Sequence, residues 1–220
     1  MRNPVTESRL LKKDLFGEVS RTNRGADACI VRDAGAADAW LRWLARLLLR
    51  REARALAALD GIAGVPQLVE VSRDRLVRSY LGGAPMHEAR PGDPAYFLRA
   101  AQLLRRLHSA GVVHNDLAKE PNILVSDDGT PAFIDFQLAW YTRNRGRLFR
   151  ILAHEDLRHL LKHKRNYCAD RLTERERRIL ANPSPISNIY MNTVKPVYRF
   201  VTRRLLGWAD REGAGNRGDR

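Results

Sequence analysis

The stretch that decides the fold is His114-Asn115-Asp116-Leu117-Ala118-Lys119-Glu120-Pro121-Asn122, followed at Ile134-Asp135-Phe136 by a second aspartate in an apolar frame. Two aspartates and an asparagine in this order are what phosphoryl transfer from ATP requires. One group orients an acceptor hydroxyl, and two hold magnesium on the phosphates. The pattern therefore predicts phosphoryl-transfer chemistry before any other part of the chain is considered.

The segments that flank this stretch place its polar residues at the ends of regular elements. A helix is predicted over Pro94–Ala110, since its apolar residues recur at helical spacing. Two apolar runs, Ile123–Val125 and Ala132–Ile134, are separated by a turn that contains Asp-Gly and predict a β-hairpin. Asn122 then stands at the entrance of the hairpin and Asp135 at its exit.

The remaining elements are predicted from short apolar runs, helical periodicity and turn residues. Strands are expected over Leu10–Val19 and Asp27–Arg32, joined by the turn Thr22–Gly25, and over Gln67–Val71 and Leu76–Leu81; helices are expected over 36–59, 148–167, 173–181 and 194–209. The break at Gly82-Gly83-Ala84-Pro85 is the natural hinge. We expect an α+β fold with a β-rich N-lobe at about 8–81, a helical C-lobe at about 84–209 and a flexible tail at 213–220.

Composition limits the chain to one globular unit with a basic surface. With 220 residues, 44% of them hydrophobic and 29% charged, the chain can fold as one core or as two small lobes around a cleft. The net charge is +14, and residues 141–220 contribute 19 Lys and Arg against 8 Asp and Glu. This surplus suits nucleic acid, an anionic membrane or phosphorylated substrates, and it equally suits a solvated surface that aids solubility.

Cysteine content and hydropathy indicate the compartment. Cys29 and Cys168 are too few for a disulfide framework or a cysteine-based zinc site, which favours a reducing cytoplasm. No apolar stretch has the length of a signal peptide core at the N-terminus or of a membrane span elsewhere. We expect a cytoplasmic protein that is at most peripheral on the inner face of the membrane.

Taken together, these residues resemble the protein-kinase-like superfamily. Over about residues 10–165 the chain is similar to small bacterial RIO-type kinases and to lipopolysaccharide (Kdo or heptose) sugar kinases. The resemblance implies a two-lobed kinase fold that uses ATP and Mg²⁺. It implies that Asp116 is the catalytic aspartate and that Asn122 and Asp135 are the magnesium ligands. His114 is expected to pack beneath the loop.

The resemblance extends to the N-lobe through a shortened glycine-rich loop and a helix glutamate. Phe16-Gly17-Glu18-Val19 resembles the end of that loop, which implies that Gly17 and Val19 lie against the nucleotide, although the earlier glycines are missing. Taken alone, Gly17 reads as a hairpin residue. Glu52 stands where the kinase helix glutamate is expected, and its alternative is an exposed helix charge.

The strand lysine that should pair with this glutamate is absent. The expected position holds Arg32, and the only lysines before Asp116 are Lys12 and Lys13. An arginine keeps the charge but replaces a compact ammonium with a planar fork. Either Arg32 takes the role or a lysine of the first strand reaches in; the strand register favours Arg32.

Two departures from the kinase pattern lie in the C-lobe motif. Asn122 follows Asp116 by six residues, where the kinase loop has five, so the intervening loop must bulge by one residue. Lys119 in this bulge either reaches the transferred phosphate or is a solvated loop lysine. Gln137 replaces the glycine that normally follows Asp135-Phe136, which makes a flip of that segment less available.

The segment after Gln137 also differs from that of regulated kinases. No Ala-Pro-Glu sequence closes it, and only residues 137–146 precede the next helix, so a linear peptide substrate becomes less expected. Asp156 either braces the catalytic loop from that helix or is an exposed charge. Residues 195–208 mix cations with aromatic and apolar groups, and they either lie on an anionic membrane or form a terminal helix on the core.

These expectations combine into a phosphotransferase that moves the γ-phosphate of ATP to a hydroxyl. A RIO-like serine/threonine protein kinase is favoured over a lipopolysaccharide core sugar kinase. A different class, a non-catalytic ATP- or RNA-binding scaffold, would explain the missing lysine and the basic surplus. It would not require Asp116, Asn122 and Asp135 to occur together.

Overall fold

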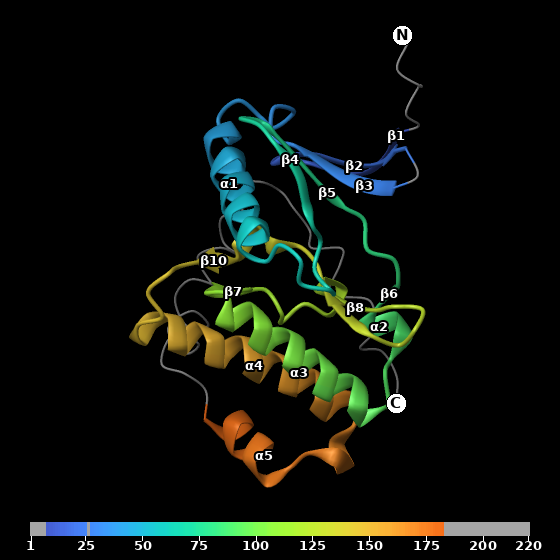
Figure 1. Cartoon of the computed structure of the whole chain (residues 1–220), viewed down its shortest axis with the longest axis vertical. Helices are drawn as coiled ribbons and strands as arrows, with labels where there is room; N and C mark the ends of the chain where they lie inside the picture. The colour runs from blue at the N-terminus through green and yellow to red at the C-terminus, as the bar shows by residue number, and fades with distance from the viewer. Residues whose placement is uncertain (1–7, 26, 183–220) are drawn as a thin grey trace, which may run out of the picture. The chain divides into compact units, whose positions relative to one another are not determined.

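The computed structural model describes residues 8–25 and 27–182, and the described residues up to Ala181 belong to one compact unit. Its N-terminal part is an antiparallel five-stranded sheet in the order β1-β2-β3-β5-β4 (Figure 1). The strands are β1 (Ser8–Asp14), β2 (Gly17–Arg24), β3 (Asp27–Asp33), β4 (Leu68–Val71) and β5 (Arg75–Ser79). The central strands β3 and β5 bury their apolar residues, whereas β1 is an exposed edge.

Helix α1 (Arg42–Ala58) connects β3 to β4 and buries one apolar stripe that includes Leu49 and Leu56. The helix was expected from residue 36 but begins at Arg42. The preceding residues form turns, in which the Asp33 carboxylate accepts a hydrogen bond from the backbone N–H of Gly35 at 2.7 Å. Such local bonds from Asp compete with helical hydrogen bonding, which explains the later start.

The C-terminal part is mostly helical and carries short strands. Its helices are α2 (Met86–Ala89), α3 (Pro94–Ser109), α4 (Arg147–Tyr167) and α5 (Glu174–Ala181), with the 3₁₀ turns η1 (Glu120–Asn122), η2 (Phe136–Leu138) and η3 (Ala169–Arg171). Its strands are β6 (Ala84–Pro85), β7 (Val112–Val113), β8 (Ile123–Val125), β9 (Pro131–Phe133) and β10 (Trp140–Tyr141). Sheets β6-β8-β9 and β10-β7 lie above the paired helices α3 and α4 (Figure 1).

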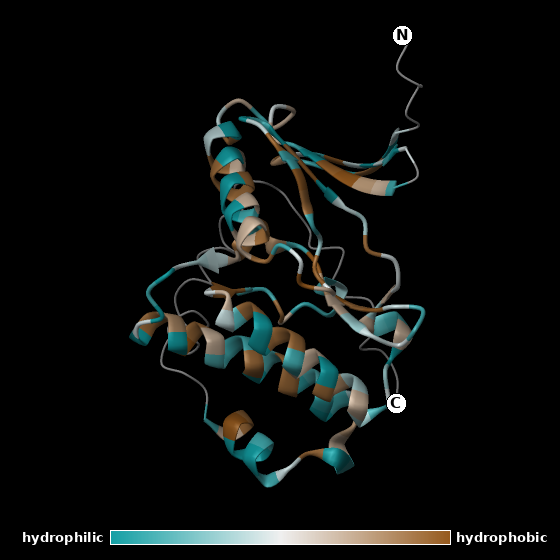
Figure 2. Cartoon of the chain, viewed as in Figure 1, coloured by the Kyte–Doolittle hydropathy of each residue, from teal (hydrophilic) through white to brown (hydrophobic). Residues whose placement is uncertain are grey.

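The sequence explains where α3 begins and which face it buries. Asp93 caps the helix by accepting the N–H of Ala95 at 2.8 Å, and Pro94 occupies the first turn, where a missing N–H costs nothing. Apolar and polar bands alternate along α3 and α4 (Figure 2). The buried bands join those of α1 in one core that runs through both parts, with Leu56, Leu104 and Phe136 among its members.

The expected α+β, two-lobed kinase-like fold is confirmed, including the β8-β9 hairpin and the helices at 94–109, 147–167 and 174–181. One strand prediction was wrong: residues 10–19 are not a single strand. The chain turns at Leu15-Phe16, and Gly17 has φ of 118°. A Cβ on Gly17 would lie 2.0 Å from the carbonyl oxygen of Asp33, so the turn requires glycine.

Three expectations concern residues outside the described part of the chain. They are the helix over 194–209, the membrane-surface reading of 195–208 and the tail at 213–220. Within the part that the structure describes, none of the helices combines the length and the hydrophobicity needed to cross a bilayer.

Candidate phosphoryl-transfer site

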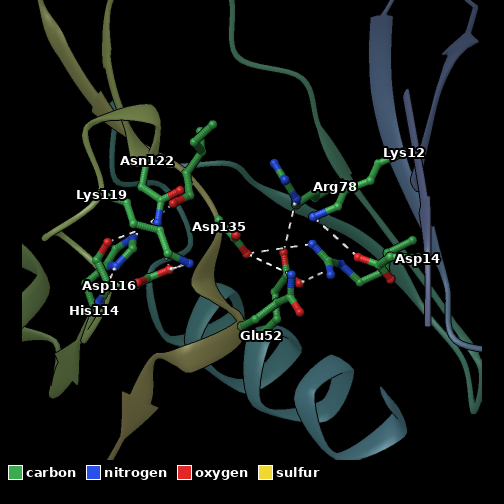
Figure 3. A network of polar contacts seen from close by, with 12 residues as sticks. Lys12, Asp14, Glu52, Arg78, His114, Asp116, Lys119, Asn122 and Asp135 are labelled. Atoms are coloured by element: carbon green, nitrogen blue, oxygen red, sulfur yellow. Dashed lines mark hydrogen bonds and ion pairs between the residues drawn. The ribbon is translucent and has the colours of Figure 1, made fainter. Parts of the chain in front are cut away.

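Asp116 lies in the loop between β7 and η1, where two side chains hold one of its carboxylate oxygens. Asn122 Nδ2 donates to Asp116 Oδ2 at 2.9 Å and to the Asp116 carbonyl oxygen at 3.0 Å. Lys119 Nζ lies 3.0 Å from the same Oδ2. These bonds fix the position of the carboxylate. They bring three of the predicted site residues together, Asp116, Lys119 and Asn122 (Figure 3).

His114 supports this loop from below, as the sequence led us to expect. Its ring is fully buried and packs on Phe136 with the ring centroids 4.6 Å apart. Nε2 lies 3.0 Å from the carbonyl oxygen of Ile134, and the N–H of Asp116 donates to Nδ1 at 3.3 Å. A neutral imidazole protonated on Nε2 satisfies both contacts, so His114 joins the loop that carries Asp116 to the strand that leads to Asp135.

Asp156 of α4 braces the same loop. Of its two expected roles, the structure supports the brace and not the exposed charge. The carboxylate is 1% exposed. It accepts the backbone N–H of His114 at 2.7 Å on Oδ2 and the N–H of Asn115 at 2.9 Å on Oδ1. Asn115 has φ of 63°, a left-handed conformation that Asn tolerates better than most residues. The brace thus holds a strained turn just before Asp116.

The extra loop residue is accommodated in η1 and anchored to α4. Glu120 Oε2 accepts a hydrogen bond from the hydroxyl of Tyr167 at 2.5 Å, and Glu120 Oε1 lies 3.5 Å from His163 Nδ1. His163 Nε2 also lies 2.8 Å from the carbonyl oxygen of Leu117. Two side chains of one helix therefore hold both ends of the lengthened loop.

Asp135 follows β9 in a left-handed conformation, with φ of 64° and ψ of 70°. Gln137 Nε2 donates to Asp135 Oδ1 at 3.0 Å, and Arg32 Nη2 lies 3.7 Å from the same oxygen. Burial alone would raise the pKa of Asp135, but the Arg32 guanidinium and the Gln137 amide lower it below its usual value. The carboxylate is ionised at neutral pH and can ligate a cation.

Glu52 of α1 is fully buried and faces two arginines rather than one (Figure 3). Arg32 Nε of β3 lies 3.2 Å from Glu52 Oε2, and Arg78 Nε of β5 lies 3.1 Å from Oε1. The reading of Glu52 as an exposed helix charge was therefore wrong. The sequence analysis did not find Arg78, although a cation two residues after Leu76 on a buried strand face was a usable signal.

The other N-lobe candidates lie near this cluster but take no part in it. Lys12 and Lys13 pair with Asp14 at 3.3 Å and with Glu18 at 2.8 Å. Val19 lies directly opposite Arg32 in the β2-β3 ladder. Gly17 begins β2 beside Asp33. Among the described residues it is Arg32, and neither lysine, that reaches Glu52.

The donor set suits a hard divalent cation shared with phosphates. Asn122 uses its Nδ2 on Asp116, which leaves the amide oxygen as a ligand beside the ionised Asp135. Over residues 8–25 and 27–182, no group of three His, Cys, Asp or Glu side chains could hold a metal. The phosphate oxygens of ATP could complete the ligands of a metal held by Asn122 and Asp135.

Comparison with known proteins agrees with this geometry. The model of the family described as RIO domain matches residues 31–177. The chain is similar to the DNA damage-responsive serine/threonine-protein kinase RqkA of Deinococcus radiodurans, with 35% identity over 114 residues, which cover 46% of this chain and 17% of the relative. It is also similar to a probable SapB synthase of Streptomyces coelicolor, with 30% identity over 123 residues, 45% of this chain and 13% of the relative.

Both relatives are much longer proteins, since the matched segments make up less than a fifth of either one. The family match, in contrast, covers most of this chain and includes Arg32, Glu52, Asp116, Asn122 and Asp135. The chain therefore belongs to the RIO domain family, and its fold is protein-kinase-like.

Proposed function

We propose that this chain transfers the γ-phosphoryl group of ATP to a hydroxyl, with a serine or threonine side chain of a protein as the acceptor. The observation that carries the proposal is the hydrogen-bonded pair of Asp116 and Asn122, with Asp135 placed between this pair and the Glu52 cluster (Figure 3). A scaffold that only binds nucleotide has no need of an oriented carboxylate in this position. The chemistry is therefore better supported than binding alone.

In this proposal Asp116 is the group that positions the acceptor. Lys119 and Asn122 hold its Oδ2, so Oδ1 can accept the hydrogen of the acceptor hydroxyl and aim its oxygen at the γ-phosphorus. The Lys119 side chain is 62% exposed beside Asp116. From there its ammonium can donate charge-assisted hydrogen bonds to the phosphoryl group during transfer. Positioning of this kind accounts for about 10²–10⁴ in rate.

The nucleotide side of the site consists of Arg32, Asn122 and Asp135, with Gly17 and Val19 above the phosphates. Arg32 keeps Nε on Glu52 while its terminal nitrogen extends toward Asp135, which is the direction in which phosphates would lie. Mg²⁺, when bound, supplies the charge that neutralises the phosphate oxygens. Gln137 orients the Asp135 carboxylate through its hydrogen bond.

A protein acceptor is favoured because one relative is named a serine/threonine-protein kinase. The sugar-kinase reading remains an outcome for experiment, as do contacts with nucleic acid or an anionic membrane. We also propose that the whole chain acts as one kinase-like domain. Cys29 and Cys168 are buried free thiols, which suits a reducing cytoplasm.

Two assays test the proposal. The first measures magnesium-dependent ATP turnover by the wild type, Asp135→Asn and the control Asp170→Asn, whose carboxylate lies on η3 away from the site. We expect turnover by the wild type and the control and none by Asp135→Asn; equal rates in all three would refute an enzyme.

The second assay incubates radiolabelled ATP with a cell lysate that is then separated into protein, lipopolysaccharide and RNA. We expect label on protein as phosphoserine or phosphothreonine. Label on lipopolysaccharide alone would favour the sugar kinase. Salt-sensitive RNA binding without turnover would favour a scaffold.

A further inference from the structure

Arg78 is the least expected charge in the molecule, since it lies on a buried face of the central sheet. It stands opposite Ile30 in the β3-β5 ladder, and Arg32 stands opposite Leu76. Alternation along the two strands places Arg78, Leu76 and Arg32 on one face, and Leu76 belongs to the main core on that face. The side chain of Arg78 is 9% exposed. Two arginines thus enter the protein interior side by side.

Each oxygen of Glu52 has its own arginine. Arg78 Nε lies 3.1 Å from Oε1, and Arg32 Nε lies 3.2 Å from Oε2. Arg32 also approaches Asp135, whereas no other acid is within ion-pair distance of Arg78 in the described part of the chain. Among the described residues, the direct ion pair of Arg78 is with Glu52, whereas Arg32 lies within ion-pair distance of both Glu52 and Asp135 on the phosphate side of the site.

A single arginine could not fully compensate the charge of Glu52 and bind phosphates at the same time. Glu52 is fully buried, and a buried carboxylate that loses its counter-charge is strongly destabilising. If Arg32 were the only partner, every movement of its guanidinium toward phosphates would weaken the compensation of Glu52. With Arg78 in place, Glu52 stays compensated, and Arg32 can turn its terminal nitrogens toward an anion.

The position of Arg78 is costly, which argues against an incidental charge. Burial lowers the pKa of Arg78, and Glu52 opposes that effect. An apolar residue would fill the same space without desolvating a cation. A charge kept in the core at such a cost is expected where it serves function.

We propose that Arg78 is a positioning residue for ATP binding: it holds Glu52 in place from β5, so that Arg32 can hold the phosphates. This inference rests on the proposed function, because it assigns Arg78 to the same nucleotide site. Arg78 acts through Glu52 and Arg32 and does not itself touch the nucleotide.

The test compares the wild type, Arg78→Met, Arg78→Lys and the control Arg75→Met, an exposed arginine of the same strand, in steady-state ATP turnover. We expect Arg78→Met to raise the KM for ATP about tenfold with a smaller change in kcat, because ground-state and transition-state phosphate binding weaken together. Arg78→Lys should restore part of the affinity, and Arg75→Met should match the wild type. A KM for Arg78→Met equal to that of the wild type would overturn the proposal.

A double-mutant cycle with Glu52→Gln separates positioning from mere stability. If Arg78 acts through Glu52, Arg78→Met should change the KM for ATP little in the Glu52→Gln background. Independent, additive effects would overturn the proposal. Should Arg78→Met not fold by circular dichroism, Arg78→Gln replaces it with the same expected rise in KM.

The two proposals fail in different ways. If the wild type itself shows neither ATP binding nor turnover, both the proposed function and the proposed role of Arg78 are wrong. If the wild type turns over ATP and the Arg78 variants do so with an unchanged KM, only the role of Arg78 is wrong.

Discussion

Asp156 shows how one buried carboxylate can shape a loop that lies far away in the sequence. Its two oxygens accept the N–H groups of His114 and Asn115, and Oδ2 also lies 3.3 Å from His108 Nε2. The loop geometry therefore depends on both oxygens of this side chain acting as acceptors.

We predict that Asp156→Asn destabilises the protein by about 2 kcal/mol, because the amide presents donor hydrogens to donors that are already buried. The rate of ATP turnover should fall together with the stability, because Asp116 loses its fixed position. Chemical denaturation and ATP turnover of the same preparation measure both effects. The matched control is Asp170→Asn, an exposed carboxylate on η3; equal stability of Asp156→Asn and this control would contradict the brace.

Individual residues differ in how far the sequence could predict them. The order of Asp116, Asn122 and Asp135 pointed to one site because each residue flanks a short, recognisable element. For Arg78 the local signal, a cation two residues after the buried Leu76, marks only its strand face, since its partner depends on which strand lies beside β3. The order β3-β5 is a long-range feature, and a single sequence does not specify it.

At the scale of elements, the lengthened loop between Asp116 and Asn122 is a structured part of the site. The 3₁₀ turn η1 takes up the additional residue, and Glu120 ties this turn to α4 through Tyr167 and His163. Helix α4 therefore supports the loop twice, at its start through Asp156 and at its end through Glu120.

We predict that Tyr167→Phe lowers kcat several-fold and destabilises the fold by about 1 kcal/mol, since it removes one hydrogen bond to a charged group and leaves the ring packing intact. Tyr141→Phe is the control, because Tyr141 is also half-buried but lies on β10. Hydrogen exchange of the Ala118, Lys119, Glu120 and Asn122 amides should speed up in Tyr167→Phe alone. Unchanged exchange there would show that Glu120 does not anchor the loop.

The same scale explains which elements the sequence predicted well. Helices α3, α4 and α5 and the β8-β9 hairpin agree with the expectations to within one residue at every boundary, because caps, periodicity and an Asp-Gly turn are local signals. The β1-β2 turn at Leu15-Phe16 carried two local signals, Gly17 and Asp14, whose carboxylate accepts the N–H of Phe16 at 2.8 Å. It was missed because a close approach to Asp33 across the sheet, which makes that glycine necessary, is not visible in the sequence.

At the scale of the whole molecule, α1 links the sheet to the segment after Asp135. Arg51 donates to the carbonyl oxygens of Leu138 and Ala139 at 3.2 and 3.3 Å, while Glu52, the next residue, faces the sheet. Both lobes also share one apolar core. We therefore expect the described part of the chain to unfold as one cooperative unit rather than lobe by lobe.

Acid should weaken this unit through His159. Burial lowers the pKa of His159 to about 4, and the nearby Lys162 adds to the effect. An unfolded His has a pKa of about 6.5, so the unfolded state binds the proton first. Stability is full above about pH 6.5 and falls as the pH drops toward 4. Thermal unfolding of His159→Gln should show a shallower loss over this range than the wild type; parallel curves would show that other groups govern acid sensitivity.

The most direct test of the central claim is single-turnover transfer of radiolabelled γ-phosphate by the wild type and by Asp116→Asn, with ATP affinity measured on the same samples. Asparagine fills the same space as aspartate but cannot accept the hydroxyl hydrogen as a carboxylate does. We predict a fall in the transfer rate of at least about 10², with ATP affinity close to that of the wild type. Equal transfer rates for the two proteins would contradict phosphoryl transfer at this site.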